Sequence, residues 1–430
     1  MTPIVGTNRE TMKNGGAMTS RERVLASVRH QEPDKVPVDL GATPSSGISA
    51  VAYHNLKQHL GIPDGHTRVY DVVQQLAQPE EVILDRFGID VLDIGRTFNT
   101  RDEDWYDITI AGGIPAQFPS WFHPVRQPDG SQDAFIDGTR IATMPKAATF
   151  FDQTYFPYLG GYPDDYKGLP EEMGKVLWAG LVHSPWDSAH LPDFWQQLRE
   201  RAIALRSSSD RALMVVAGCN LFEWGTFLRR MDNFLMDLVT SPGEVERCLD
   251  ALMEQHLATL EKVCQAVGDV VDFLRFGDDL GMDTGPFMAP EVYRQLFKPR
   301  HAILCDYVKK HSHMHTFLHS CGSLYKLLPD LIEAGYDVIN PVQTNARDME
   351  PERLKREFGK DITFWGGGCD TRSVLNRARP AEVKEHVKRR LDIFMPGGGF
   401  VFSTVHNILL DVPPQNIMAV FEAIDEFDDG

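Results

Sequence analysis

The sequence predicts a closed (β/α)8 barrel, in which eight parallel strands alternate with helices in one domain. Short apolar segments alternate with helical segments over most of the 430 residues. This alternation implies right-handed βαβ units and a parallel sheet. Eight strands favour a closed barrel over an open doubly wound sheet. The open sheet also requires a Gly-rich phosphate fingerprint after its first strand, and G-A-T-P-S-S-G, at residues 41–47, is not one.

The predicted strands are apolar runs that end at polar residues. They cover residues 36–41, 89–95, 212–218, 270–276, 314–318, 338–342, 362–365 and 399–403. The predicted helices cover residues 20–30, 46–60, 194–205, 223–238, 242–267, 290–311, 324–334, 352–358, 381–394 and 415–427. Ser20 is the expected N-cap of the first helix, with Arg23 at the position where a capping box prefers Glu or Gln.

Residues 101–181 interrupt this alternation. They are rich in aromatic residues, Pro and Gly, with F-F-D-Q-T-Y-F-P-Y-L-G-G-Y at positions 150–162. We expect an insertion that covers the barrel mouth within the domain formed by residues 20–430. Its aromatic side chains either line a substrate pocket or form a small separate core. Residues 1–19 are polar and Gly-rich, and we expect a disordered N-terminal extension there.

Composition excludes two classes of partner. The formal net charge is −18, and the chain has no dense Lys/Arg run, which argues against nucleic acid. No apolar run approaches the ~20 residues that a membrane span needs. The six Cys are scattered, and no signal-peptide pattern opens the chain, so we expect a reducing, cytoplasmic setting.

Polar residues follow most of the predicted strands. In a barrel the carboxyl ends of the strands form the active site, so these residues are the candidate site. They are Asp39, Asn220, Glu223, Asp278, Asp279, His319, Cys321, Gln343, Cys369, Asp370, His406 and Asn407. Polar loops are common after strands, but Cys and His are not generic turn formers.

A metal site is predicted at the end of the fifth strand. His319 and Cys321 are two residues apart, so in an extended chain they project to the same side. An imidazole beside a thiolate is half of a zinc site. Catalytic zinc keeps three protein ligands and one open position, so either Cys369 or His406 is expected to be the third ligand. The alternative is a buried Cys next to a hydrogen-bonded His.

The remaining candidates are carboxylates and amides. Asp278 and Asp279 are adjacent, so their side chains should diverge, with Asp279 facing the barrel mouth. Asp279, Asp39 and Glu223 are the predicted catalytic residues. The amide side chains predicted to bind a cofactor are Asn220, Gln343 and Asn407.

Several motifs resemble the uroporphyrinogen decarboxylase superfamily, and within it the corrinoid-dependent methyltransferases. They are T-S-R-E-R-V-L-A-S-V-R-H-Q-E-P-D-K-V-P-V-D at residues 19–39, F-G-D-D-L-G at 276–281, H-S-C-G at 319–322, W-G-G-G-C-D-T at 365–371 and V-P-P-Q-N-I at 412–417. The H-x-C pattern is what points to the methyltransferase branch.

The resemblance implies zinc-dependent methyl transfer on a (β/α)8 barrel. The methyl group passes between a small molecule and the cobalt of a corrinoid (cobalamin) carried by a separate protein. The small molecule is a methyl donor, such as a methoxylated aromatic that undergoes O-demethylation, or a thiol or folate acceptor. The branch has H-x-C followed by a late Cys. His319 and Cys321 match the first part, whereas the place of the late Cys falls at His406 and Cys369 lies one strand earlier.

Two other functions stay open. The Arg-rich motif of the decarboxylase itself is replaced here by D-L-G-A-T-P-S-S, at residues 39–46, which argues against uroporphyrinogen as the substrate. A metal-free decarboxylase of a small acid, using Asp39 or Asp279, is one alternative. A non-enzymatic partner of a corrinoid protein, or a methyl-donor sensor, is the other. The sequence leaves open the methyl donor or acceptor, the direction of transfer and whether the chain forms a homo-oligomer.

Overall fold

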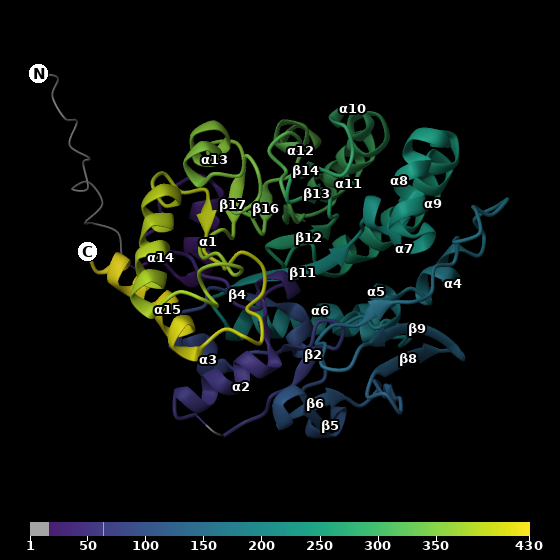
Figure 1. Cartoon of the computed structure of the whole chain (residues 1–430). Coiled ribbons are helices and arrows are strands. Elements are labelled where there is room, and N and C mark those ends of the chain that lie inside the picture. The colour runs from purple at the N-terminus through teal and green to yellow at the C-terminus, as the bar shows by residue number, and fades with distance from the viewer. Residues whose placement is uncertain (1–16, 63) are drawn as a thin grey trace, which may run out of the picture.

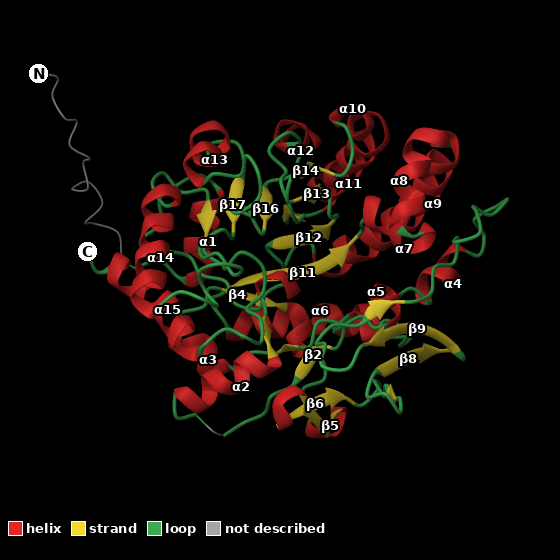
Figure 2. Ribbon diagram, viewed as in Figure 1, coloured by secondary structure: helices red, strands yellow, loops and turns green. Residues whose placement is uncertain are grey.

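A parallel sheet of seven strands curls through the centre of the molecule, with helices around its outside (Figures 1 and 2). The computed structural model describes residues 17–62 and 64–430, so the predicted N-terminal extension lies almost wholly outside the described residues. The strands neighbour one another in chain order: β4 (Val91–Asp93), β11 (Ala212–Gly218), β12 (Phe273–Gly277), β15 (His315–His319), β16 (Val338–Asn340), β17 (Thr363–Trp365) and β18 (Phe400–Val401).

An eighth segment closes this sheet into a barrel. Val38 forms a parallel bridge with Phe402, next to the last strand. The carbonyl of Val38 also accepts a 2.8 Å hydrogen bond from the Asp90 N–H, next to the first strand. Pro37 has no N–H to donate, which helps to keep this segment to a single bridge. The predicted (β/α)8 barrel is therefore confirmed, with its first strand the shortest.

Alternate residues of the strands point inward and fill the amino-terminal half of the barrel. Phe273 and Phe317 each pack edge-on against Trp365, with ring centroids 5.2 Å apart. Val24 and Val28 of helix α1 (Ser20–Val28) belong to the same buried cluster. Helix α1 therefore closes the amino-terminal end, and open space is left at the carboxyl ends of the strands.

The N-cap of the first helix lies one residue earlier than the sequence predicted. Thr19, not Ser20, is its N-cap, and the Thr19 side chain accepts a hydrogen bond from the Glu22 N–H. Glu22 in turn accepts a hydrogen bond from the Thr19 N–H. The pattern T-x-x-E thus forms a complete capping box, and the prediction of Ser20 with Arg23 was wrong because it was displaced by one residue.

The outer helices occupy the predicted segments with shifted ends, except α3, which the sequence did not predict. They are α2 (Ala50–His59), α3 (Glu81–Arg86), α6 (Phe194–Ser208), α7 (Phe222–Arg229), α8 (Met231–Thr240), α9 (Pro242–Val267), α10 (Pro290–Val292), α11 (Lys298–His311), α12 (Leu328–Ala334), α13 (Pro351–Phe358), α14 (Pro380–Phe394) and α15 (Pro414–Asp428). The helix predicted over residues 223–238 is broken at Arg230, whose φ of 67° does not fit a right-handed helix.

Residues 101–181 form small antiparallel units in the lower right of Figure 1. Strands β5 (Trp105–Ile110) and β6 (Ile114–Pro119) make a hairpin. A four-stranded sheet contains β7 (Val125–Arg126), β8 (Gln132–Ile136), β9 (Thr139–Met144) and β10 (Asp152–Gln153), and two short helices follow, α4 (Leu169–Gly174) and α5 (Leu177–Gly180).

Other short strands decorate the connections of the barrel. Strands β1 (Ile48–Ser49), β2 (Val69–Asp71) and β3 (Leu76–Ala77) form a small sheet, and β13 (Gly281–Met282) pairs with β14 (Gly285–Pro286). No helix among the described residues combines the length and the apolar composition needed to cross a lipid bilayer.

Candidate metal centre

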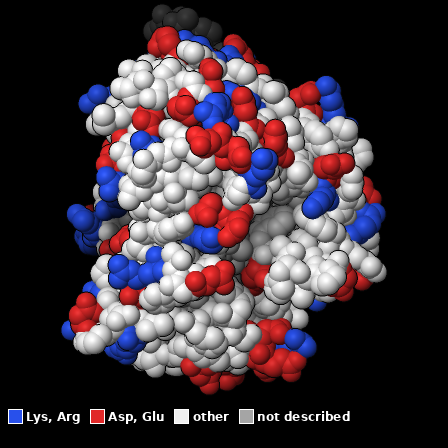
Figure 3. Space-filling model, turned by 90° about the vertical axis from the view of Figure 1, so that its right-hand side faces the viewer, with Lys and Arg blue, Asp and Glu red and all other residues white. Residues whose placement is uncertain are grey.

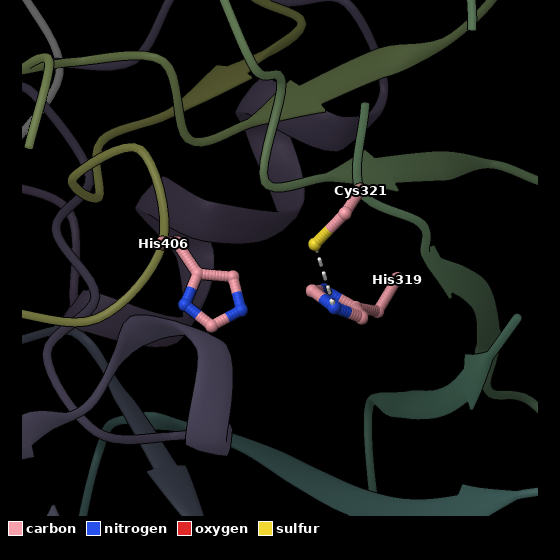
Figure 4. A group of neighbouring side chains, drawn as sticks. All are labelled: His319, Cys321 and His406. Carbon is pink, nitrogen blue, oxygen red and sulfur yellow. Dashed lines mark hydrogen bonds between the residues drawn. The ribbon is translucent and has the colours of Figure 1, made fainter. Parts of the chain in front are cut away.

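Three side chains that can bind a metal converge at the carboxyl ends of the strands. His319 is the last residue of β15, Cys321 follows two residues later, and His406 lies in the loop after β18. Their ligand atoms all lie within 4.8 Å of one another. Figure 4 shows the imidazole of His406 facing the other two side chains from the opposite wall. Histidine nitrogen and cysteine sulfur are the ligands that zinc prefers.

Strand geometry brings His319 and Cys321 together. The two residues project to the same side, and Cys321 Sγ lies 3.6 Å from His319 Nε2 (Figure 4). Ligands around tetrahedral zinc are separated by about 3.5 Å, so this pair already has a suitable spacing. Next to them, Gly322 has a φ of +87°, and a Cβ there would lie 2.2 Å from the backbone of Gly281. The turn after Cys321 therefore requires glycine.

The third member of the cluster is held by an unusual backbone conformation. His406 has a φ of +67°, in the left-handed region that residues other than glycine rarely adopt. Its imidazole is inclined to that of His319, with ring centroids 5.6 Å apart. Strained conformations of this kind cluster at functional sites, so the conformation itself supports a role for His406.

The structure separates the two candidates for the third ligand. Cys369 is fully buried and is not part of the cluster. Burial raises the pKa of its thiol well above the ordinary value, as expected for an inert cysteine in the core. The geometry therefore favours His406 over Cys369.

The side chain of Asn340 fixes the orientation of His319. Asn340 Nδ2 donates to the carbonyl of Trp365, so Asn340 Oδ1 faces His319 Nδ1 at 2.7 Å and must accept its proton. Ser45 Oγ donates to the same oxygen. The Nε2 lone pair of His319 is thus left free toward Cys321. Sequence reasoning missed Asn340, although it is a polar residue inside the predicted strand over residues 338–342.

The adjacent carboxylates diverge. Asp278 is buried and accepts hydrogen bonds from the N–H groups of Phe222 and Glu223, at the start of helix α7. Asp279 turns toward the cluster. Its Oδ1 accepts a 2.8 Å hydrogen bond from the Cys321 N–H and lies 3.6 Å from His319 Nε2.

Electrostatics around the cluster suit a cation. Burial lowers the pKa of His319 and of His406, so both imidazoles are neutral at pH 7, as metal ligands must be. Burial, together with the charges of Asp279 and Glu223, raises the pKa of the Cys321 thiol. A thiolate at this position therefore needs a nearby positive charge, which a divalent cation would supply.

A cavity of about 480 Å³ opens above these residues. The face of the molecule seen in Figure 3 is hollowed, with acidic and basic side chains around the hollow. Asn220, Glu223, Asp279, His319 and His406 are among the polar residues that line the cavity. Its apolar wall includes Phe150, Trp178 and Leu181 from residues 101–181, Val182 and Trp186 just after them, Val216 of β11, and Trp224 and Phe227 of α7.

Glu223 and Asn220 form a pair within this cavity. Asn220 Nδ2 donates a hydrogen bond to Glu223 Oε2. Burial raises the pKa of Glu223 well above its usual value, and the charges of Asp279 and Asp278 raise it further. The buried setting therefore favours the protonated form of the Glu223 carboxyl beside the metal cluster.

Three other predicted site residues make hydrogen bonds around the cluster without lining the cavity. Asp39 accepts hydrogen bonds from Trp365 Nε1 and the Ala42 N–H, and burial raises its pKa to about 6. Gln343 bridges the Gly322 N–H and Asp283. Asn407 Nδ2 donates to Gln74 Oε1. These three residues do not line the cavity, so the structure gives them supporting contacts rather than access to a ligand.

Arg275 lines the cavity and was also missed by sequence reasoning. It points inward from β12. The signal was present, because Arg275 is a charged residue inside the apolar strand F-L-R-F-G, at residues 273–277.

Fold and site together define a (β/α)8 barrel with a candidate metal centre at the carboxyl ends of its strands. Residues 221–427 match the family model described as uroporphyrinogen decarboxylase (URO-D). This match confirms the resemblance to the uroporphyrinogen decarboxylase superfamily seen in the sequence motifs.

Solved structures extend the comparison to almost the whole chain. A methyltransferase from Methanosarcina mazei aligns with a TM-score of 0.57 and 16% sequence identity, over 95% of this chain and 99% of that one. A structural likeness at this low sequence identity shows that the two proteins share a fold. No curated protein sequence matches the chain.

Proposed function

We propose that this protein is a zinc-dependent methyltransferase that moves a methyl group between a small molecule and the cobalt of a separate corrinoid protein. The observation that carries the proposal is the convergence of His319, Cys321 and His406 on one cavity. The family match and the fold shared with a methyltransferase support it. The chain has no D-x-H-x-x-G corrinoid-binding motif, so the corrinoid must arrive on a partner.

His319, Cys321 and His406 would hold the zinc ion with two nitrogens and one sulfur, a three-residue ligand set of the kind found in catalytic zinc sites. Bound zinc supplies Lewis acidity there, either to the heteroatom of a methyl donor or to a thiol that accepts the methyl group.

The surrounding residues orient the ligands and handle the proton. Asn340 keeps His319 in the tautomer with Nε2 free, and Asp279 holds the Cys321 backbone. Glu223 lines the cavity, and burial raises its pKa, so its protonated form is placed to give a proton to a leaving group. In the opposite direction of transfer, its ionised form would take the proton from a thiol.

The wall of the cavity indicates the kind of small molecule. Three Trp and two Phe side chains line it, which favours an apolar or aromatic substrate and excludes water from the reacting groups. A methoxylated aromatic donor that undergoes O-demethylation fits this wall. A thiol or folate acceptor is the substrate if transfer runs from the corrinoid.

Metal content and methyl transfer of two matched variants test the proposal. Cys321→Ala should lose stoichiometric zinc and methyl transfer to a corrinoid protein. Cys369→Ala removes a buried thiol outside the cluster and should keep both. Full activity of Cys321→Ala, or wild-type protein that is active after chelation and binds no zinc, would contradict the proposal. Release of CO2 from a small acid under those conditions would favour the metal-free decarboxylase instead.

A further inference from the structure

The Arg275 guanidinium lies in the cavity without a partner. Its Nε is buried and makes no hydrogen bond to any described residue. Among residues 17–62 and 64–430, no carboxylate forms an ion pair with Arg275, although many other arginines of the protein are paired. A guanidinium has five N–H donors, and leaving them unmatched in a protein interior is costly.

The nearby carboxylates are committed to other contacts. Glu223 accepts a hydrogen bond from Asn220, and Asp279 accepts one from the Cys321 N–H. Burial lowers the pKa of Arg275, and the charges of Glu223 and Asp279 only oppose this effect from a distance. Arg275 is therefore not explained as half of a structural ion pair.

The backbone leaves room for Arg275 to reach toward the barrel mouth. Gly277 follows two residues later on the same face of β12, and a Cβ there would lie 3.1 Å from an Nη atom of Arg275. The missing side chain lets the guanidinium extend to the level of His319, which pairs with Gly277 across the sheet. Arg275 and the metal cluster thus face the same space.

A second polar group, on strand β2, is also unmatched. The buried hydroxyl of Tyr70 has no hydrogen-bond partner among the described residues. The Tyr70 ring packs edge-on against His183, a cavity residue, with centroids 5.4 Å apart. Two unmatched donors beside an apolar cavity indicate that a ligand with acceptor atoms completes their hydrogen bonds.

We infer that Arg275 binds an anionic head group, a carboxylate or sulfonate, on the small-molecule substrate. This inference rests on the proposed function in so far as the cavity is the substrate site. The aromatic wall takes the apolar body of the molecule, and Arg275 fixes its charged end. Arginine matches planar carboxylates with two parallel hydrogen bonds, so it orients the ligand as well as attracting it. The arginine stands on the fourth barrel strand, not after the first strand where the decarboxylase carries its Arg-rich motif.

The inference is tested by the equilibrium binding of small-molecule probes to the full-length protein, a measurement that requires no catalytic turnover. The probes are 4-methoxybenzoate and its neutral isostere 4-methoxybenzamide, measured by calorimetry. Wild-type protein should bind the carboxylate more tightly, and Arg275→Gln should weaken that binding by about 10- to 100-fold while leaving the amide unchanged. Arg372→Gln is the control, because Arg372 is exposed, pairs with Asp283 and should keep the preference.

A second probe, 2-mercaptoethanesulfonate, distinguishes the source of the anion. Binding of only this thiol, in a manner that depends on Arg275, supports the inference and assigns the head group to a methyl acceptor. Measurable binding of carboxylate and amide with equal affinity by wild-type protein would overturn the inference. An anion preference that is unchanged in Arg275→Gln, or no binding of any of these anions, would also overturn it.

Zinc removal separates this inference from the proposed function. Cys321→Ala should lose zinc and methyl transfer yet keep a preference for anions that depends on Arg275. Anion binding that persists while every methyl-transfer assay fails leaves the inference standing and rejects the function. Thermal unfolding checks that the variants fold. Arg275→Met removes a charge that has no partner, so its unfolding midpoint should equal or exceed that of wild type.

Discussion

Asn340 Oδ1 lies 2.7 Å from His319 Nδ1, and this contact determines which nitrogen of the imidazole faces the cavity. The amide orientation is itself set by the bond from Asn340 Nδ2 to the carbonyl of Trp365. The arrangement is the one by which proteins orient metal-binding histidines, with a polar group holding the nitrogen that is not a ligand.

Asn340→Ala should weaken zinc binding by about 10- to 100-fold, because His319 loses the group that fixes its tautomer. Competition with a chromophoric chelator measures this affinity. Asn345→Ala is the control, since Asn345 bonds to Asp370 outside the cluster. Wild-type zinc affinity in Asn340→Ala would show that Asn340 does not orient a ligand.

Glu223→Gln should retain zinc but lower methyl transfer by about 10²- to 10⁴-fold, the usual contribution of a general acid or base. Glutamine keeps the shape of the side chain and cannot exchange the proton. Turnover and zinc content are measured on the same preparation. Glu172→Gln, which alters a carboxylate bonded to Tyr155, should change neither quantity. A kcat close to wild type would remove Glu223 from the mechanism.

Trp178→Ala should raise the KM for an aromatic substrate more than it lowers kcat. Trp178 lines the cavity and packs against Phe227, yet 41% of its surface is exposed. Its removal should therefore change stability by no more than about 0.5 kcal/mol, as for most surface substitutions. Trp121→Ala is the matched control, at 38% exposure and outside the cavity. Equal KM values for the two variants would argue against an aromatic binding wall.

Asp93→Asn should be more stable than wild type at pH 7, and this gain in stability should be smaller at pH 4.5. Burial raises the pKa of Asp93 from 3.8 to about 6, so the folded state holds a proton that the unfolded state releases. The contribution of Asp93 to the free energy of unfolding is fully present below about pH 4 and is lost as the pH rises through 6. By pH 7 the loss amounts to about 3 kcal/mol. Asparagine can still accept the bond from the Gly95 N–H.

Thermal unfolding at the two pH values measures this effect, and Asp337→Asn is a control of opposite sign. Burial opposes ionisation of Asp337, but hydrogen bonds from His315, Lys309 and Thr316 outweigh it and lower its pKa. Its contribution is therefore present at neutral pH and lost on acidification. If the stability of wild type and of Asp93→Asn depended on pH in the same way, the raised pKa of Asp93 would be contradicted.

Local chemistry allowed the architecture to be predicted. The alternation of apolar strands and helices predicts a parallel barrel, because each strand must cross back over the sheet through a helix. The errors were local as well. The first helix was displaced by one residue at its cap, and the long helix over 223–238 was not seen to break at Arg230.

The sequence by itself determined that a barrel forms and that His319 and Cys321 project together from a strand end, since both follow from the period of two along a strand. Only the tertiary structure decided the third member of the cluster. His406 reaches it through a loop with a positive φ, whereas Cys369 turns into the core. The unmatched state of Arg275 is likewise a property of its surroundings, because whether a charge finds a partner depends on residues distant in the chain.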